Sequence, residues 1–199
     1  MSELASLRRQ IRVARRLLSA EARSYAAERL AERLSLTHAF QRAERLAAYW
    51  AADGEMDPQP LMQRAWAAGK QVYLPVIGID RRLAFARYSD GSPLRPNRFG
   101  IPEPLVDADD WCDTIALQLV LMPLVAFDER GTRLGMGGGF YDQTFSFVRR
   151  RPHLQRPLLI GAAYELQRVS HLERRPWDVP LDAVATEARI YHVSTAHPV

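Results

Sequence analysis

Cysteine and lysine are almost missing from this chain of 199 residues. Cys112 is the single cysteine, so a disulfide within the chain is excluded and a zinc site built on several thiolates is disfavoured. One cysteine also favours a reducing compartment. Lys70 is the single lysine among 27 basic residues, and the other 26 are arginines. Arginine suits bidentate binding of phosphate or carboxylate and is also common on solvated surfaces, so its abundance alone leaves both interpretations open.

Long apolar runs are also missing. Residues 115–127 form the longest stretch, but Gln118 and Pro123 interrupt it and it is too short to span a bilayer. The opening sequence MSELASLRRQ has no apolar stretch after its charges, unlike a secretory signal. We therefore expect a cytoplasmic protein with no membrane partner.

The remaining composition is that of an ordinary globular protein. Hydrophobic residues make up 47% of the chain and charged residues 25%, which excludes a disordered or collagen-like chain. The length suits one domain over residues 1–199. Residues 1–50 hold ten arginines and five acidic residues, whereas the formal net charge of the whole chain is +4. This basic segment lacks the interleaved aromatic residues of a single-strand nucleic-acid surface, so we do not expect nucleic acid as a partner.

Apolar periodicity predicts alternating helices and strands. The helices are expected at residues 3–18, 19–34, 57–69 and 141–149. The strands are expected at residues 46–52, 71–77, 83–88, 117–125, 158–164 and 183–193. Residues 89–104, rich in proline and glycine, are expected to form an irregular connection. The strand–helix–strand spacing indicates parallel pairing, so we predict an α/β fold: a single three-layer α/β/α domain with a mostly parallel central sheet.

The most distinctive segment is rich in glycine. Five of the 11 glycines lie within residues 131–139, directly after the most apolar strand and directly before a helix. In open α/β sheets ligands bind at the carboxyl ends of strands, and glycines there let backbone N–H groups and a helix dipole meet an anion. We therefore interpret the segment as an anion-binding loop rather than a flexible turn. It has no G-K-[ST] and so is not a Walker A loop, and Phe140 breaks the dinucleotide fingerprint.

Two carboxylates and two aromatic residues are further candidates for a ligand site. Asp142, just after the glycines, either complements the helix dipole or holds Mg²⁺ against phosphates, and the local sequence does not decide between these. Glu55 follows the strand at 46–52, where a loop can present a carboxylate to a ligand, although such residues are more often solvated or capping. Trp50 and Tyr49 are more typical of a core. Neither H-E-x-x-H nor G-x-S-x-G occurs, so neither a zinc hydrolase nor a serine nucleophile is predicted.

Six segments resemble, in order, the 5-formyltetrahydrofolate cyclo-ligase family, also called methenyltetrahydrofolate synthetase: LRRQIRVARRLLS, GEMDPQPL, GKQVYLPV, FGIPEP, PLVAFDERGTRLGMGGGFYD and WDVPLDAVATE. The resemblance extends over residues 7–190, and its most specific part leads from P-x-x-x-F-D to R-L-G-x-G-x-G-[FY]-Y-D. It implies a single α/β/α domain and a ligase that closes 5-formyltetrahydrofolate to 5,10-methenyltetrahydrofolate. ATP would be the co-substrate and Mg²⁺ the cofactor, with ADP and phosphate released. Small molecules would be the partners, and we expect a monomer.

Carried onto this chain, the resemblance implies three sets of site residues. The ATP phosphates would be bound by Arg8, Arg133, Leu134, Gly135, Met136, Gly137, Gly138, Gly139, Phe140 and Tyr141. Within this set, Arg133 and Tyr141 would be catalytic. The folate would be bound by Trp50, Glu55, Met136, Gly137, Gly138, Gly139 and Phe140, the Glu55 carboxylate accepting N–H groups of the pterin. Mg²⁺ would be held by Asp142 and Asp178, with Asp182 as the alternative to Asp178.

The chain departs from the family pattern at two cationic positions. Many members have a lysine where this chain has Leu4, and many read R-G-K-G where it has residues 136–139. Arg9, Arg12 or Arg16 could replace the missing cations, and glycine amides can bind phosphate without a side chain. Two alternatives therefore stay open. One is a non-catalytic or RNA-associated member that uses the arginine-rich helix, and the other is a related ligase acting on another pterin or a thiamine-pathway compound.

Overall fold

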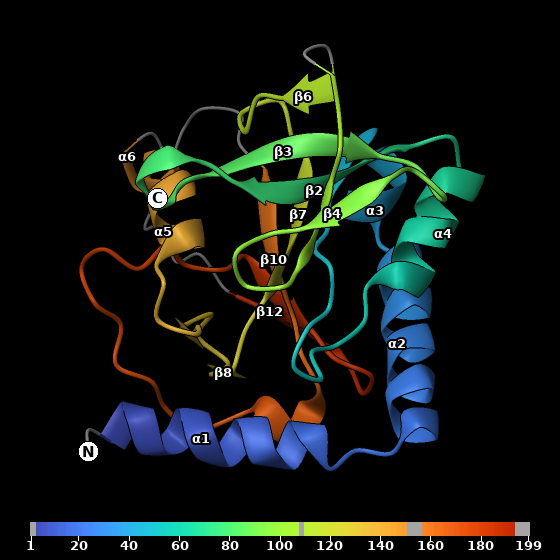
Figure 1. Cartoon of the computed structure of the whole chain (residues 1–199). Coiled ribbons are helices and arrows are strands. Elements are labelled where there is room, and N and C mark those ends of the chain that lie inside the picture. Colours follow the sequence, from blue (N-terminus) through green and yellow to red (C-terminus); the bar gives the residue numbers. More distant parts are fainter. Residues whose placement is uncertain (1–2, 108–109, 151–156, 194–199) are drawn as a thin grey trace, which may run out of the picture.

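Eight strands form one sheet in the computed structural model, which describes residues 3–107, 110–150 and 157–193. Their order across the sheet is β12, β11, β10, β7, β1, β2, β3, β6. Their bounds are β1 Arg45–Ala47, β2 Gln71–Ile77, β3 Leu83–Tyr88, β6 Trp111–Cys112, β7 Leu119–Pro123, β10 Leu158–Ala162, β11 Ala183–Ala185 and β12 Ile190–His192. The neighbours from β11 to β2 pair in parallel, and the antiparallel pairings lie at the two margins. The predicted α/β class and mostly parallel sheet are confirmed (Figure 1).

Strand β7 lies in the parallel part of the sheet, bonded to β10 on one side and to β1 on the other. Its first four side chains, Leu119, Val120, Leu121 and Met122, have no exposed surface. Leu119 and Leu121 join the core on one face, and Val120 and Met122 join the core on the other. Successive side chains of a strand point to opposite faces, so a strand covered on both faces needs an unbroken apolar run.

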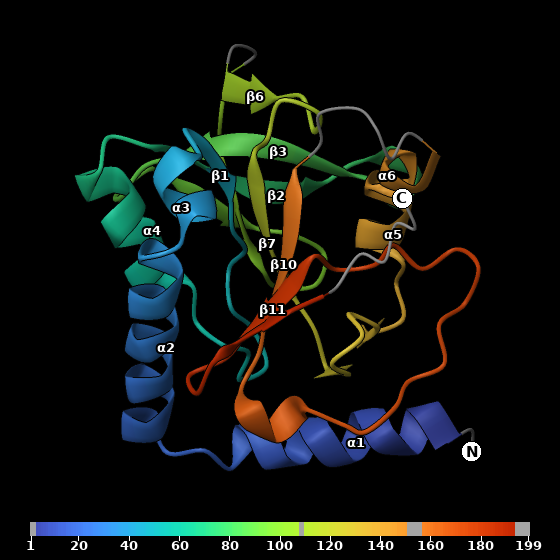
Figure 2. The same ribbon diagram turned by 180° about the vertical axis from the view of Figure 1, so that it is seen from behind.

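Helices cover both faces of the sheet (Figures 1 and 2). The helix bounds are α1 Glu3–Arg16, α2 Ala20–Ser35, α3 His38–Arg42, α4 Gln59–Ala67, α5 Phe140–Thr144 and α6 Ser146–Arg150. Helices α2, α3 and α4 complete the core on one face, where Leu30 and Leu34 of α2 are fully buried. Phe145, which ends α5, and Val148 of α6 complete the core on the other face. The three predicted layers are therefore present.

Helix α1 covers neither face but lies across the carboxyl ends of the parallel strands, at the bottom of Figure 1. Its apolar residues Leu4, Leu7 and Ile11 follow helical spacing and pack in a small cluster of their own. Leu134 and Leu172 are buried members of that cluster. The helix is therefore fixed against the loops that leave the sheet rather than against the sheet itself.

Some predicted elements are shorter or divided. Strand β1 ends at Ala47, so most of the first predicted strand is a loop. The last predicted strand, residues 183–193, is a hairpin of β11 and β12. The hydroxyl of Thr186 accepts hydrogen bonds from the backbone N–H groups of Ala188 and Arg189 at 3.2 and 3.1 Å, which closes the turn between the two strands. The last predicted helix is divided into α5 and α6.

The connections hold more regular structure than predicted. The additional bounds are β4 Leu94–Pro96, β5 Pro102–Pro104, β8 Ala126–Phe127, β9 Arg133–Leu134 and the short 3₁₀ helices Ile79–Arg81 and Glu165–Gln167. Strands β4 and β5 form an antiparallel ribbon inside the connection predicted to be irregular, and β8 and β9 form a hairpin that leads into the glycine-rich segment. Helix α3 was not predicted. None of the described helices is long and apolar enough to cross a membrane.

Candidate functional site

The predicted site residues come mainly from loops at the carboxyl edge of the sheet. The chain leaves β1 through residues 48–57, which carry Trp50 and Glu55. It leaves β7 through the β8–β9 hairpin and residues 135–139, the glycine-rich loop. Because β1 and β7 are parallel neighbours, their following loops begin side by side. Helix α1 runs beneath both of them (Figure 1).

The loop at residues 48–57 is fixed by hydrogen bonds of its own. The Glu55 side chain accepts a hydrogen bond from the backbone N–H of Ala52 at 3.1 Å. The hydroxyl of Tyr164 donates to the backbone carbonyl of Glu55 at 3.2 Å, and the hydroxyl of Tyr49 donates to that of Met56. Burial raises the pKa of the Glu55 carboxyl above its usual value, because its charged form is partly removed from water. The loop therefore presents a half-buried carboxylate in a set position.

Trp50 in the same loop is half-buried and packs against the core covered by α2 and α4. Its ring meets that of Tyr88 edge to face, with centroids 6.0 Å apart. Packing against Tyr88 is sufficient to explain an apolar residue at this position. The contact of Trp50 with a folate ring stays a prediction.

The glycine-rich loop is shaped by backbone conformations that side chains disfavour. Gly137 and Gly139 have φ angles of 99° and 69°, in the left-handed half of the map. Gly139 is the residue that precedes α5. Met136 is 53% exposed, and Gly137 and Gly139 are exposed as well. The loop thus offers backbone rather than cationic side chains to solvent at the beginning of α5.

Arg133 and Asp142 form an ion pair behind this loop. A guanidinium nitrogen of Arg133 lies 2.6 Å from Oδ1 of Asp142, and the Arg133 side chain is 7% exposed. The backbone N–H of Val179 donates to the same oxygen at 3.0 Å, and Arg133 also donates to the carbonyl of Val179. Asp142 is therefore tied both to β9 and to the segment that carries Asp178.

Asp178 precedes Val179, so the two predicted metal ligands come from segments that are hydrogen-bonded to each other. One oxygen of Asp178 accepts a hydrogen bond from the backbone N–H of Arg175 at 2.9 Å. Asp182 lies elsewhere: its carboxylate accepts the backbone N–H of Leu159, near the beginning of β10, at 2.8 Å. That position is near the amino end of the parallel strand β10, and the choice between Asp178 and Asp182 stays a prediction. Within the described residues, no group of three or more His, Cys, Asp or Glu side chains is arranged to hold a metal ion.

Two aromatic side chains, Phe140 and Tyr141, directly follow the loop in α5. Tyr141 stacks on Phe145 with ring centroids 6.3 Å apart, and its burial, with a smaller effect of the nearby Glu55 carboxylate, raises its pKa far above the usual value. Phe140 meets Phe99 edge to face at 6.2 Å. Phe99 was not predicted as a site residue. Phe99 begins the segment FGIPEP, which is part of the family resemblance. The sequence did not predict the hydrogen bond from the backbone N–H of Phe99 to the side chain of Asn97, which shapes the turn.

The arginines of α1 divide into two groups. Arg8 donates from Nε to the backbone carbonyl of Gly135 at 2.8 Å, so the structure brings it to the glycine-rich loop, and its contact with the ATP phosphates stays a prediction. Arg12 and Arg16 form ion pairs with Asp53, and whether either of them replaces a missing cation stays open. Arg9 is exposed. Leu4 packs in the apolar cluster beneath α1.

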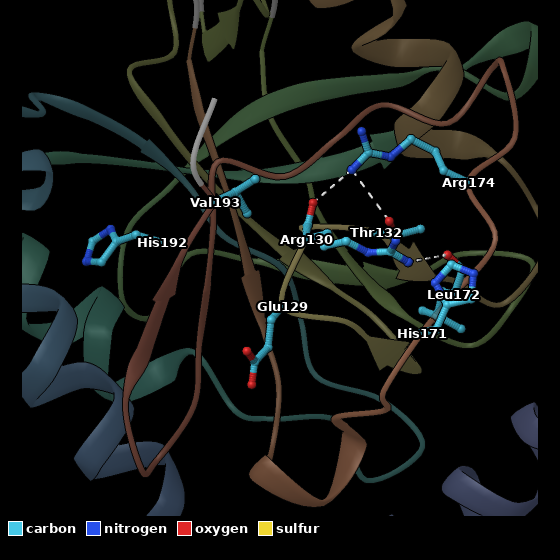
Figure 3. Close-up of a pocket in the computed structure, with 8 residues that line it drawn as sticks. All are labelled: Glu129, Arg130, Thr132, His171, Leu172, Arg174, His192 and Val193. Carbon is cyan, nitrogen blue, oxygen red and sulfur yellow. Dashed lines mark hydrogen bonds between the residues drawn. The ribbon is translucent and has the colours of Figure 1, made fainter. Parts of the chain in front are cut away.

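A hollow of about 520 Å³ lies beside the β8–β9 hairpin (Figure 3). None of the residues predicted for the site lines it. Its polar side chains make contacts within the protein: Arg174 donates to the carbonyl of Arg130 at 2.9 Å, and Arg130 donates to the buried carboxylate of Asp128 at 3.1 Å. Glu129 pairs with Arg168 at 2.8 Å. These bonds hold the hairpin turn that precedes Arg133.

Residues 1–187 match the sequence pattern of the 5-formyltetrahydrofolate cyclo-ligase family. The 5-formyltetrahydrofolate cyclo-ligase of Escherichia coli strain K12 is 39% identical over 186 residues, which cover 91% of this chain and 98% of that protein. The enzyme of the same name from Haemophilus influenzae is 39% identical over 143 residues, covering 71% and 74%. The chain belongs to the 5-formyltetrahydrofolate cyclo-ligase family. It is accordingly a ligase.

The fold agrees with this membership. The solved structure of 5,10-methenyltetrahydrofolate synthetase from Aquifex aeolicus is similar with a TM-score of 0.82 and 28% identity, covering 100% of this chain and 96% of that one. The part of the chain that matches the family contains Arg8, Glu55, the glycine-rich loop, Asp142 and Asp178. Family membership thus extends over every loop described above, while the role of each residue stays a prediction.

Proposed function

We propose that this ligase converts 5-formyltetrahydrofolate to 5,10-methenyltetrahydrofolate, with ATP as co-substrate and Mg²⁺ as cofactor, and releases ADP and phosphate. The observation that carries the proposal is the meeting of two loops at one edge of the sheet. A glycine-rich loop contacted by Arg8 lies next to a loop that presents the half-buried Glu55. The first suits phosphate and the second suits a heterocycle with N–H donors.

Glu55 is assigned to the pterin part of the substrate. A carboxylate offers two acceptor oxygens, which match a neighbouring amino group and ring N–H. The bonds from Ala52 and Tyr164 set its loop before the substrate arrives, so little conformational entropy is lost on binding. Trp50, Met136 and Phe140 would supply apolar surface around the ring.

The ATP phosphates are assigned to residues 133–141 together with Arg8. Glycines without side chains let backbone N–H groups approach the phosphates, and the adjoining Arg8 and Arg133 bring positive charge. Both arginines already bond to the loop or to its base, Arg8 at the carbonyl of Gly135 and Arg133 at Asp142. Their positions are consistent with neutralising charge that develops during phosphoryl transfer.

The chemistry of Asp142 and Asp178 fits a magnesium ion. Mg²⁺ prefers carboxylate oxygens, binds through one or two of them and takes its remaining ligands from water and phosphates. When bound, it would neutralise charge on the transferred phosphate. Arg133 and the N–H of Val179 hold the carboxylate of Asp142 in place for that role.

The reaction follows from the weak reactivity of a formamide. The formyl oxygen attacks the γ-phosphorus of ATP, a new P–O bond forms, and the bond to ADP breaks. N10 of the same folate then attacks the formyl carbon and loses its proton, and phosphate leaves with the former formyl oxygen. The protein forms no covalent bond, so its residues act by positioning and charge neutralisation.

The test is direct. Purified protein incubated with ATP, Mg²⁺ and 5-formyltetrahydrofolate should develop the near-ultraviolet absorbance of the methenyl product. The control omits ATP, and circular dichroism confirms that the protein is folded. Absence of an ATP-dependent rise from folded protein would contradict the proposal. Competition with other pterins and with thiamine-pathway compounds would identify a related ligase with another substrate.

The contacts of α1 weaken the RNA-associated alternative. Arg12, Arg15 and Arg16 bond to Asp53, and Arg8 bonds to Gly135, so much of the basic helix is engaged within the protein. Salt-dependent RNA binding that is lost when Arg8, Arg9 and Arg12 are neutralised would restore it.

A further inference from the structure

Three arginines of α1 converge on one carboxylate in the loop that carries Glu55. Nε of Arg12 lies 2.7 Å from Oδ2 of Asp53, a guanidinium nitrogen of Arg15 lies 3.0 Å from the same oxygen, and Arg16 pairs with Oδ1. The Asp53 side chain is 20% exposed. Desolvation acts to raise the pKa of Asp53 but is outweighed by the hydrogen bonds from Arg12 and Arg16, which lower it. The carboxylate is therefore charged at neutral pH.

Arg15 extends this cluster into the interior. Its side chain has no exposed surface, and it donates to the backbone carbonyl of Asp53 from Nε at 3.1 Å and from a terminal nitrogen at 2.9 Å. It also reaches the carbonyl of Leu124, just beyond β7, at 3.4 Å. A buried cation persists where it is fully partnered, so these bonds tie α1, the loop at 48–57 and the end of β7 together.

The backbone at Asp53 supports a functional constraint. Asp53 has φ 53° and Gly54 has φ 71°, two successive residues in the left-handed region. A Cβ at Gly54 would lie 3.6 Å from the carbonyl oxygen of Arg15, so the loop turns closely against the end of α1. Residues in such conformations persist where the surroundings hold them, and they gather at binding sites.

The same side of α1 contacts the second loop. Arg8 precedes Arg12 by four residues and Arg15 by seven, which places the three on one face of the helix. At its first turns this face bonds to Gly135, and at its last turn to Asp53. Helix α1 therefore links the predicted folate loop, residues 48–57, to the predicted phosphate loop, residues 135–139.

We infer that Asp53 is a positioning residue: by holding α1 through Arg12, Arg15 and Arg16, it sets Glu55 relative to the glycine-rich loop. In this inference Asp53 acts through the three arginines and not by contact with a substrate. This inference rests on the proposed function, because the distance that Asp53 would set is the one between the bound folate and the ATP phosphates. Small errors in such a distance cost phosphoryl transfer more than they cost either binding step alone.

The test uses Asp53→Asn in the full chain. Asparagine tolerates the left-handed conformation, and the bonds from Arg15 to the backbone carbonyl remain, so the variant should fold. We expect kcat to fall about 10- to 100-fold, with a smaller change in KM for 5-formyltetrahydrofolate, because Glu55 is no longer fixed relative to the phosphates. Arg12→Gln removes one of the three guanidinium groups and should act in the same direction with a smaller effect.

Amide hydrogen exchange gives a readout that does not need the reaction. In Asp53→Asn, the backbone N–H of Gln143, which bonds to the carbonyl of Gly139 at 2.9 Å, should exchange faster than in the wild type, because the glycine-rich loop is held by Arg8 and so depends on the position of α1. The control is Glu28→Gln, which removes the same charge from the surface pair with Arg64 at 3.4 Å and should leave both readouts unchanged.

The outcomes separate the two proposals. Faster exchange confined to residues 48–57 and the end of α1 would show a local structural role and overturn the inference. Unchanged KM and kcat in Asp53→Asn, in an enzyme whose wild type is active, would overturn it as well. A wild type that makes no methenyl product would contradict the proposed function alone, and the exchange of the Gln143 N–H would still decide whether α1 couples the two loops.

Discussion

The loop after β1 and the glycine-rich loop lie at the same edge of the sheet, but they are held in different ways. In residues 48–57, tyrosine hydroxyls bond to backbone carbonyls and Asp53 bonds to three arginines. In residues 135–139, Arg8 donates to the carbonyl of Gly135 and the backbone N–H of Gln143 donates to the carbonyl of Gly139. Met136, Gly137 and Gly139 are exposed.

The difference matches the two kinds of ligand proposed for them. A flat heterocycle is recognised by acceptors in fixed places, so a loop that is ordered in advance binds it with less loss of entropy. A triphosphate is recognised by charge and by backbone N–H groups that close around it, which glycines allow. Substitutions should therefore affect folate and ATP kinetics separately, in the order given below.

The largest effect is expected at Asp142, the anchor of the phosphate side. Asp142→Asn is nearly isosteric but removes the charge that pairs with Arg133 and that would bind Mg²⁺. We expect kcat to fall by about 100-fold or more, the usual loss when a transition-state charge interaction is removed. Steady-state kinetics over a range of Mg²⁺ concentrations checks this, with KM for the folate changed little.

Near wild-type turnover of Asp142→Asn at low Mg²⁺ would contradict the metal assignment. Arg175→Gln is a suitable control. Arg175 contacts Asp178 through its backbone N–H, so the substitution leaves that hydrogen bond intact. Its kinetics should stay close to those of the wild type.

The next effect is expected at Glu55, on the folate side. Glu55→Gln keeps one acceptor for the N–H of Ala52 but replaces a charged acceptor of the pterin with an amide. Loss of one charged hydrogen bond amounts to about 1.5–3 kcal/mol, so KM for 5-formyltetrahydrofolate should rise about 10- to 100-fold. KM for ATP should change by less than about threefold if the two loops bind separately. An equal rise in both constants would contradict the division.

A smaller effect is expected from the glycine that begins α5. Gly139→Ala introduces a side chain at φ 69°, which strains the backbone by about 1 kcal/mol. Gly69 is a matched control, because it has φ 71° and a Cβ there would also meet nothing within 4 Å. Both variants should lose similar stability in urea unfolding, but Gly139→Ala alone should raise KM for ATP, by about fivefold for a shift of about 1 kcal/mol. A similar change in Gly69→Ala would point to a general loss of folded enzyme.

The sequence predicted the α/β scaffold and the position of the glycine-rich loop because both depend on local patterns. The apolar run at β7 and the cluster of glycines are continuous in sequence, and their meaning follows from position in an α/β chain. The partners of Asp53 could not be predicted in this way. Its ion pairs join residues about 40 positions apart, and they depend on α1 crossing the edge of the sheet rather than covering a face.

The same limit applies to the predicted metal ligands. Asp178 and Asp182 are four residues apart in one motif, and the sequence left the choice between them open. The fold separates them, because Val179 bonds to Asp142 while the Asp182 carboxylate bonds to Leu159 at the other end of the strands. Short segments between strands change direction within a few residues, so spacing alone does not say which edge of the sheet a carboxylate reaches.

The smallest effect concerns stability and again distinguishes the ordered loop. Burial raises the pKa of Glu55 above its ordinary value of 4.5, so the folded state binds this proton more tightly than the unfolded state. The contribution of Glu55 to the free energy of unfolding therefore decreases as the pH rises from 4.5 through the raised pKa. Glu55→Gln carries no charge to desolvate, so at pH 7 it should be more stable than the wild type, by about 0.5 kcal/mol, and at pH 4 the difference should vanish. Urea unfolding at the two pH values checks this. A variant less stable than the wild type at pH 7 would mean that the ionised Glu55 stabilises its loop. The carboxylate would then have a structural role, and it would not be a group whose burial lowers stability in order to bind the pterin.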